Sequence, residues 1–188
     1  SACSLVRGTF QTYREPRCGA KIDLRIFCHR PGGTLSPSRL AKGSMRDTDP
    51  CVSALDDLPH GPEFRFVDEV VELDPGRSAT GRYRVRGDEA FLAGHFPGRP
   101  LMPGVILVEA IAQLGGVAAQ SDPEHGAIDG LLLTGIRAAK ILGAAEPGET
   151  LEIRVEVEGR LGGMIQISGE IESAGRKLAS AKVMLSGT

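Results

Sequence analysis

Apolar and charged residues alternate strictly along residues 151–158, which read LEIRVEVE. Such alternation predicts a strand of an antiparallel sheet, with one face in the protein core and the other in water. We expect further strands at 128–142, 164–173 and 177–185, where apolar runs are bounded by short turns that contain Gly or Pro. The C-terminal third of the chain is therefore predicted to form four consecutive strands.

The segment before these strands predicts a hairpin followed by one helix. Residues 64–73 and 78–86 have the character of strands, and the sequence DPGR between them supplies Pro and Gly where a turn requires them. Residues 103–120 are apolar at nearly every position, and their length and alanine content favour a buried helix. A curved antiparallel sheet wrapped around this long apolar helix would bury it on all sides, so we expect an α+β fold.

Residues 1–50 differ from the rest of the chain in pattern and in charge. They lack sustained periodicity and contain the linker-like stretch RPGGTLSPSR. Nine Lys or Arg and four Asp or Glu give this segment a charge of +5, whereas the remainder carries −7. We expect a disordered extension ahead of one domain at 51–188, with a native start at Met45 as the preferred interpretation and an organelle transit peptide as the alternative.

Composition excludes several classes of function. A net charge of −2 and the absence of Trp provide neither the basic stripe nor the stacking platform typical of nucleic-acid binding. Polar residues and glycines break the apolar runs well short of a membrane span. The four cysteines form no CxxC pair, so a zinc site is not expected. The first residues lack the apolar core of a secretory signal, and we expect a cytoplasmic protein unless residues 1–50 are a transit peptide.

A glutamate and a glutamine interrupt the predicted helix. Because Glu is rarely buried without a compensating partner, Glu109 is a candidate for chemistry. Gln113 lies one turn further on the same face and can hold the Glu109 carboxyl group by a hydrogen bond. An apolar surround favours the protonated form of a carboxyl group, which can then act as an acid.

Two further candidates precede Glu109. His95 lies in a loop bounded by Gly and Pro, and Gly104 opens the helix, where free backbone N–H groups and the helix dipole favour an anionic ligand. Each feature alone has a structural explanation, since loop histidines and Pro-Gly turns are common. Together, His95, Gly104 and Glu109 provide the base, the oxyanion donor and the acid that a proton-abstraction site requires.

The stretch GHFPGRPLMPGVILVEAIAQLGG closely resembles the signature of the 3-hydroxyacyl-(acyl-carrier-protein) dehydratases of dissociated fatty-acid synthesis, which have the hotdog fold. The resemblance covers about residues 58–187. It implies that His95 and Glu109 are the catalytic pair, that the Gly104 N–H binds the thioester carbonyl, and that Gln113 steadies Glu109. Dehydratase-isomerases of the family have an aspartate as the acid, so the glutamate favours the dehydratase that does not isomerise.

The same resemblance implies the partners of the protein. The substrate is a 3-hydroxyacyl chain linked through phosphopantetheine to an acyl carrier protein, and no metal or organic cofactor is needed. Hotdog dehydratases form homodimers or larger assemblies of dimers, in which the histidine of one chain faces the acid of the other. Because carrier proteins are acidic and the domain carries −7, we expect basic residues to dock the carrier, with Arg99, Arg137, Lys140 and Arg160 as candidates.

The sequence departs from the family pattern in two places. Where members read LPHRYPFLLVDR, this chain reads LPHGPEFRFVDE, so His60 lacks the neighbouring Arg-Tyr pair and is expected to be structural. Where members read KFRRPVVPGD, this chain reads KILGAAEPGE, which leaves the carrier contacts and the acyl-chain length open.

Two other functions are compatible with these residues. A thioesterase or enoyl hydratase of the same fold would act on coenzyme A esters and would not need to dock a carrier. A catalytically idle hotdog subunit would only bind acyl chains or complete a heterodimer. The presence of His95 and Glu109 in the expected order argues against an idle subunit.

Overall fold

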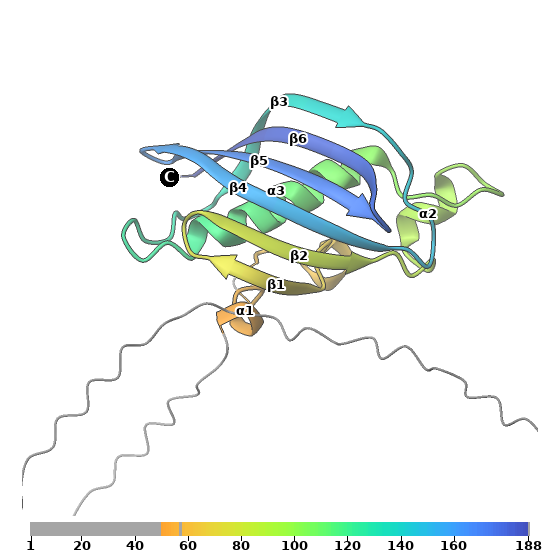
Figure 1. Ribbon diagram of the computed structural model, residues 1–188, viewed down its shortest axis with the longest axis horizontal. Coiled ribbons are helices and arrows are strands. Elements are labelled where there is room, and N and C mark those ends of the chain that lie inside the picture. The colour runs from red at the N-terminus through yellow and green to blue at the C-terminus, as the bar shows by residue number, and fades with distance from the viewer. Residues whose placement is uncertain (1–49, 57, 188) are drawn as a thin grey trace, which may run out of the picture.

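A curved antiparallel sheet of six strands wraps around one long helix (Figure 1). The computed structural model describes residues 50–56 and 58–187. The strands are β1 Glu69–Asp74, β2 Ser78–Arg84, β3 Leu132–Ile141, β4 Thr150–Leu161, β5 Met164–Ser173 and β6 Arg176–Ser186. The helices are α1 Pro50–Ser53, the 3-10 helix η1 Pro62–Phe64, α2 Ala90–Gly94 and α3 Gly104–Gln120.

The strand order in the sheet is β1-β2-β4-β5-β6-β3, and all neighbouring strands are antiparallel. The predicted order of two strands, one long helix and four strands is confirmed, and so is the α+β class. The chain order explains the sheet order, because the return from α3 brings β3 to the far edge, beyond β6.

Helix α3 packs against the inner face of the sheet. Eleven of its 17 residues are buried, so it is enclosed on most sides as its apolar sequence predicts. At Gly115, an added Cβ would lie 2.6 Å from the Ile167 side chain on β5, so only a glycine allows this close approach. The alternation predicted for 151–158 also holds, because Leu151, Ile153 and Val155 are buried and Val157 is partly buried.

Strand β1 begins later than the sequence pattern predicts. Residues 64–73 were expected to form the strand, but a 3-10 turn comes first and regular pairing starts at Glu69. The reason is a tertiary contact, in which the Phe66 backbone N–H donates to the Gln113 side-chain oxygen at 2.9 Å. Short helices α1 and α2 were not predicted either, since four or five residues are too few to show a periodicity.

Strand β3 forms an edge of the sheet and is exposed along its length. Nine of its ten residues are exposed, and Leu132, Ile136 and Ile141 are large apolar residues among them. Unpaired backbone groups and apolar side chains on an edge strand form a surface that proteins usually cover. This edge is therefore a candidate contact surface.

Two further expectations concern the chain as a whole. The disorder predicted for residues 1–50 lies outside the described residues, apart from Pro50, which begins α1. Across the residues that the structure describes, no helix is long and apolar enough to span a membrane.

Candidate active site

His95 follows α2 directly, and a backbone carbonyl holds its ring. The Nδ1 atom lies 2.9 Å from the carbonyl oxygen of Leu101. Because a carbonyl oxygen can only accept, Nδ1 carries the hydrogen and Nε2 of the neutral ring keeps its lone pair. Nε2 is therefore the nitrogen that can take a proton from a substrate.

The residue after His95 has a strained backbone. Phe96 has a φ of 53°, in the left-handed region that bulky side chains rarely adopt. Its exposed ring lies against the His95 imidazole, with a centroid distance of 4.4 Å and an angle of 61° between the planes. This turn places an apolar ring beside the candidate base.

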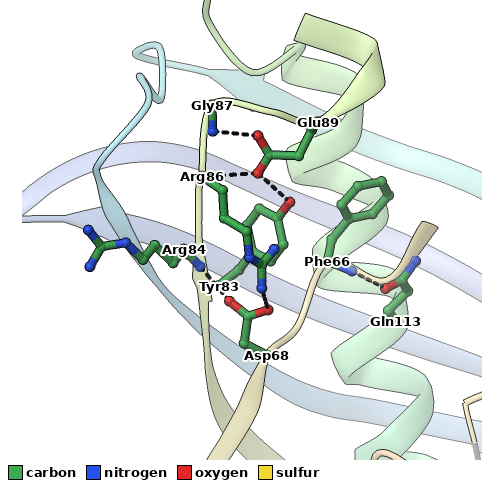
Figure 2. Close-up of polar contacts among 8 residues, drawn as sticks. All are labelled: Phe66, Asp68, Tyr83, Arg84, Arg86, Gly87, Glu89 and Gln113. Atoms are coloured by element: carbon green, nitrogen blue, oxygen red, sulfur yellow. Dashed lines mark hydrogen bonds and ion pairs between the residues drawn. The ribbon is translucent and has the colours of Figure 1, made fainter. Parts of the chain in front are cut away.

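Glu109 lies on α3 and is held by Gln113, one turn further along the helix. The Gln113 amide nitrogen donates to Glu109 Oε1 at 3.0 Å and to the Phe64 carbonyl oxygen at 2.9 Å. The Gln113 oxygen accepts the Phe66 N–H at 2.9 Å, as Figure 2 shows. Because backbone groups fix both ends of this buried amide, its nitrogen must face Glu109. The structure thus makes the contact that the sequence suggested for Gln113.

His60 lies closer to the site than the sequence suggests. Its Nε2 lies 3.5 Å from Glu109 Oε1, although the departure from the family pattern led us to expect a structural residue. The two residues are far apart in the sequence, and no local pattern links them. The fold therefore brings His60 beside the candidate acid.

Glu109 lines a cavity of about 760 Å³. His60 and Gln113 line it beside Glu109, and most of the remaining wall is apolar, including Leu58, Gly116, Val117, Leu131 and Leu185. His95 is not part of this wall, and within the described residues no contact joins it to Glu109. Within one chain, the candidate base and acid are therefore not joined by a hydrogen bond or an ion pair.

Gly104 is the first residue of α3, and Pro103 occupies the N-cap position. The first N–H groups of a helix have no partner within it, so they can donate to a ligand. An added Cβ on Gly104 would lie 3.0 Å from the Ile141 side chain at the end of β3. Ile141 belongs to the segment that departs from the family pattern, so this departure lies next to the candidate oxyanion donor.

A polar network at the end of β2 holds the start of α2 (Figure 2). The Tyr83 hydroxyl donates to the Glu89 carboxylate at 3.0 Å, and the same carboxylate accepts the backbone N–H groups of Arg86 at 2.8 Å and Gly87 at 2.7 Å. Arg86 also pairs with Asp68. Because α2 begins after Glu89 and ends next to His95, this network fixes the segment that carries the candidate base.

The contacts in this network shift the pKa values of Tyr83 and Glu89. Burial, together with the bond to Glu89, raises the pKa of Tyr83 above its ordinary value. Partial burial opposes ionisation of Glu89, but the N–H groups of Arg86 and Gly87 and the Tyr83 hydroxyl outweigh it and hold the pKa of this carboxyl below its ordinary value. Sequence reasoning missed Tyr83 and Glu89, and the available signal was an acidic residue just before the short segment AFLAG.

The four docking candidates differ in exposure. Arg99, Arg137 and Lys140 are exposed. Arg160 has a side chain only 12% exposed and donates at 2.6 Å to the carbonyl oxygen of Ala119, in the last turn of α3. A cation at this place complements the helix dipole. Arg160 is therefore expected to stabilise the C-terminal end of α3 and not to contact a carrier protein. Arg99, Arg137 and Lys140 remain as candidates for contact with an acyl carrier protein.

The sequence of this chain is similar to those of known 3-hydroxyacyl-(acyl-carrier-protein) dehydratases. A family model described as the FabA-like domain matches residues 58–182. The 3-hydroxyacyl-(acyl-carrier-protein) dehydratase FabZ of Chloroflexus aggregans is 46% identical over 102 residues, which cover 54% of this chain and 69% of that protein. The enzyme of the same name from Dechloromonas aromatica is 36% identical over 135 residues, covering 71% of this chain and 94% of that protein.

Solved structures agree on the fold. The dehydratase heterocomplex ApeI:P from Xenorhabdus doucetiae superposes with a TM-score of 0.61 at 20% identity, over 73% of this chain and 91% of that chain. At this identity the likeness concerns the fold alone. The hotdog fold implied by the sequence resemblance is confirmed.

Proposed function

This chain belongs to the FabA-like domain family and is a 3-hydroxyacyl-(acyl-carrier-protein) dehydratase of fatty-acid synthesis, and we propose that His95 and Glu109 carry out its reaction. The orientation of His95 is the observation that supports this assignment most directly, because the Leu101 carbonyl leaves Nε2 free to accept a proton. Glu109 lines the apolar cavity and is held by Gln113. A base and an acid are the two groups that a dehydration requires.

The proposed reaction moves two protons in opposite directions. His95 Nε2 takes the proton from the carbon beside the thioester carbonyl, and the electron pair of that C–H bond forms the new double bond. The C–O bond at the next carbon breaks, and Glu109 gives its proton to the departing hydroxyl group, which leaves as water. The product is a trans-2-enoyl thioester, and the enzyme is left with a protonated His95 and an ionised Glu109.

Negative charge develops on the thioester oxygen during proton removal, and Gly104 is the proposed donor to it. A backbone N–H at the start of α3 stabilises this charge together with the positive end of the helix dipole. The absence of a side chain at Gly104 lets the oxygen approach closely.

We propose that two chains share each site, with His95 of one chain facing Glu109 of the other. The lack of contact between the two residues within one chain supports this arrangement. The exposed apolar edge strand β3 offers a surface where a second copy can pair, and a self-complementary contact of this kind produces a two-fold dimer.

The proposed substrate is an acyl chain carried by phosphopantetheine on an acyl carrier protein. The cavity suits the acyl chain, because its wall runs along α3 from Glu109 to Gln120 and is mainly apolar. Arg99, Arg137 and Lys140 are the proposed contacts to the acidic carrier.

Loss of enoyl-thioester absorbance on hydration, the reverse reaction, tests the substrate assignment. We expect a higher kcat/KM for the carrier-bound enoyl chain than for the matching coenzyme A ester. Equal values would favour a coenzyme A hydratase, and release of free thiol without a change in the double bond would indicate a thioesterase.

A further inference from the structure

The Glu109 carboxyl group is anchored through one of its two oxygens. Oε1 accepts the Gln113 amide N–H at 3.0 Å, and His60 Nε2 lies 3.5 Å from the same oxygen. Among the residues that the structure describes, none bonds to Oε2. The carboxyl group is thus oriented, and Oε2 is the oxygen left free to carry a proton.

The surroundings of His60 decide which ring nitrogen carries the hydrogen. Nδ1 is buried and has no hydrogen-bond partner in the described part of the chain. A hydrogen on Nδ1 would be a buried donor without an acceptor, whereas a hydrogen on Nε2 has a carboxyl oxygen 3.5 Å from the nitrogen. Neutral His60 therefore presents its Nε2–H to Glu109.

The loop that carries His60 is tied to the amide that holds Glu109. The Phe64 ring packs near the His60 ring, with 5.9 Å between centroids, and the Arg65 guanidinium donates to the His60 carbonyl oxygen at 3.4 Å. The Phe64 carbonyl in turn accepts the Gln113 amide N–H at 2.9 Å. His60 and Gln113 therefore form a connected support on one side of Glu109.

We propose that His60 is a positioning residue for the acid Glu109, an inference that rests on the proposed function. The Gln113 amide donates to Oε1, and the nearby His60 Nε2–H adds a second N–H group beside the same oxygen, so the acidic proton stays on Oε2 for transfer to the departing hydroxyl group. Once the proton has left, the same donors stabilise the carboxylate. The Nε2–H group of His60 acts on the proton-transfer step, whereas the ring contributes to the cavity wall. Loss of the N–H group alone, with a ring kept at residue 60, therefore lowers kcat and leaves KM nearly unchanged.

Two substitutions in the full chain separate the Nε2–H group from the bulk of the ring. His60→Phe keeps an aromatic ring beside Phe64 but removes the donor, and we expect kcat to fall roughly 10- to 100-fold with KM within about twofold of the wild-type value. His60→Gln restores an N–H group and should recover most of kcat. His125→Ala, which removes an exposed histidine paired with Asp122, is the control and should leave kcat unchanged. Wild-type kcat in His60→Phe would overturn the proposal, and so would a failure of His60→Gln to exceed His60→Phe.

A double variant tests whether His60 acts through Glu109. In a Glu109→Gln background, measured at high enzyme concentration, His60→Phe should cause no further loss of turnover because the acid that it positions is already absent. A second loss as large as that in the wild type would overturn the proposal. Full turnover by Glu109→Gln alone would instead show that Glu109 is not the acid. This result would contradict the proposed function itself, whereas a second loss in the double variant would contradict only the role of His60.

Discussion

His95 Nδ1 lies 2.9 Å from the carbonyl oxygen of Leu101, six residues further along the chain. This bond ties the residue that follows α2 to the segment that leads into α3, and it determines which ring nitrogen is free to accept a proton. Because Leu101 takes part through its backbone, the role of this contact has to be tested at His95.

Replacing His95 should abolish most of the activity without unfolding the protein. We expect His95→Ala to lower kcat by roughly 10²- to 10⁴-fold, because no other group takes the substrate proton. His95→Asn is the sharper variant, since its amide can still donate to Leu101 but has no basic nitrogen. Steady-state kinetics and melting temperatures check both variants, and near wild-type turnover by His95→Asn would contradict the assignment of the base.

Replacing Glu109 with Gln should separate activity from stability. The substitution removes the acidic proton but keeps the size of the side chain and an oxygen that can accept from Gln113. We expect kcat to fall by roughly 10²-fold or more, while the melting temperature stays the same or rises, since an ionisable group no longer sits in a mainly apolar wall. A large drop in melting temperature would show that the Glu109 carboxyl group is needed for the fold.

Glu89 should make the stability of the protein depend on pH. Its pKa is lower in the folded chain than the ordinary 4.5, so its contribution is present above that value and is lost as the pH falls through the folded pKa. Glu89→Gln should lower the free energy of unfolding by about 1 kcal/mol at neutral pH. Its further loss of stability on acidification should be smaller than that of the wild type.

Urea unfolding of wild type and Glu89→Gln across this pH range measures the effect. Glu63→Gln, at an exposed residue of η1, is the control and should follow the wild-type curve. Parallel curves for wild type and Glu89→Gln would show that the bonds to Arg86, Gly87 and Tyr83 do not stabilise the ionised carboxyl group.

Charge reversal on the exposed basic residues should affect only carrier-bound substrate. We expect Arg137→Glu and Lys140→Glu to raise KM for the carrier-bound chain and to leave KM for a small thioester unchanged. Arg160→Ala should behave differently, lowering stability through the loss of its bond at the end of α3 without a selective change in KM. Both residues lie on β3, the strand proposed to pair two chains, so size-exclusion chromatography has to show that each variant keeps the wild-type oligomeric state. With the oligomer intact, equal changes in KM for both substrates would argue against docking at Arg137 and Lys140.

The parts of the fold that depend on neighbours in the sequence were predicted well. The alternation of LEIRVEVE, the DPGR turn and the apolar run of α3 each report a local structure, and each is found. The contact between Glu109 and Gln113 was predictable for the same reason, because residues four apart share a helix face.

Contacts between residues that are far apart in the sequence could not be predicted from the pattern of apolar and polar residues. His60 reaches Glu109 from a loop nearly fifty residues earlier, and Phe64, whose ring lies near the His60 ring, accepts a hydrogen bond from Gln113 across 49 residues. The bond from Phe66 to Gln113 also explains why β1 starts late, since it takes a backbone N–H that a strand would use for pairing. Tyr83 and Glu89 form their network between a strand end and a helix too short to leave a periodic signal.

The central claim is that each active site contains His95 from one chain and Glu109 from the other. A heterodimer of a His95→Ala chain and a Glu109→Ala chain would then have one site that lacks both groups and one site that is intact. Random pairing of equal amounts makes about half of the dimers hetero, so co-refolding these two inactive variants should restore roughly a quarter of wild-type activity. If mass spectrometry shows that the chains have exchanged and the mixture is still inactive, the shared site is contradicted and both residues must act within one chain.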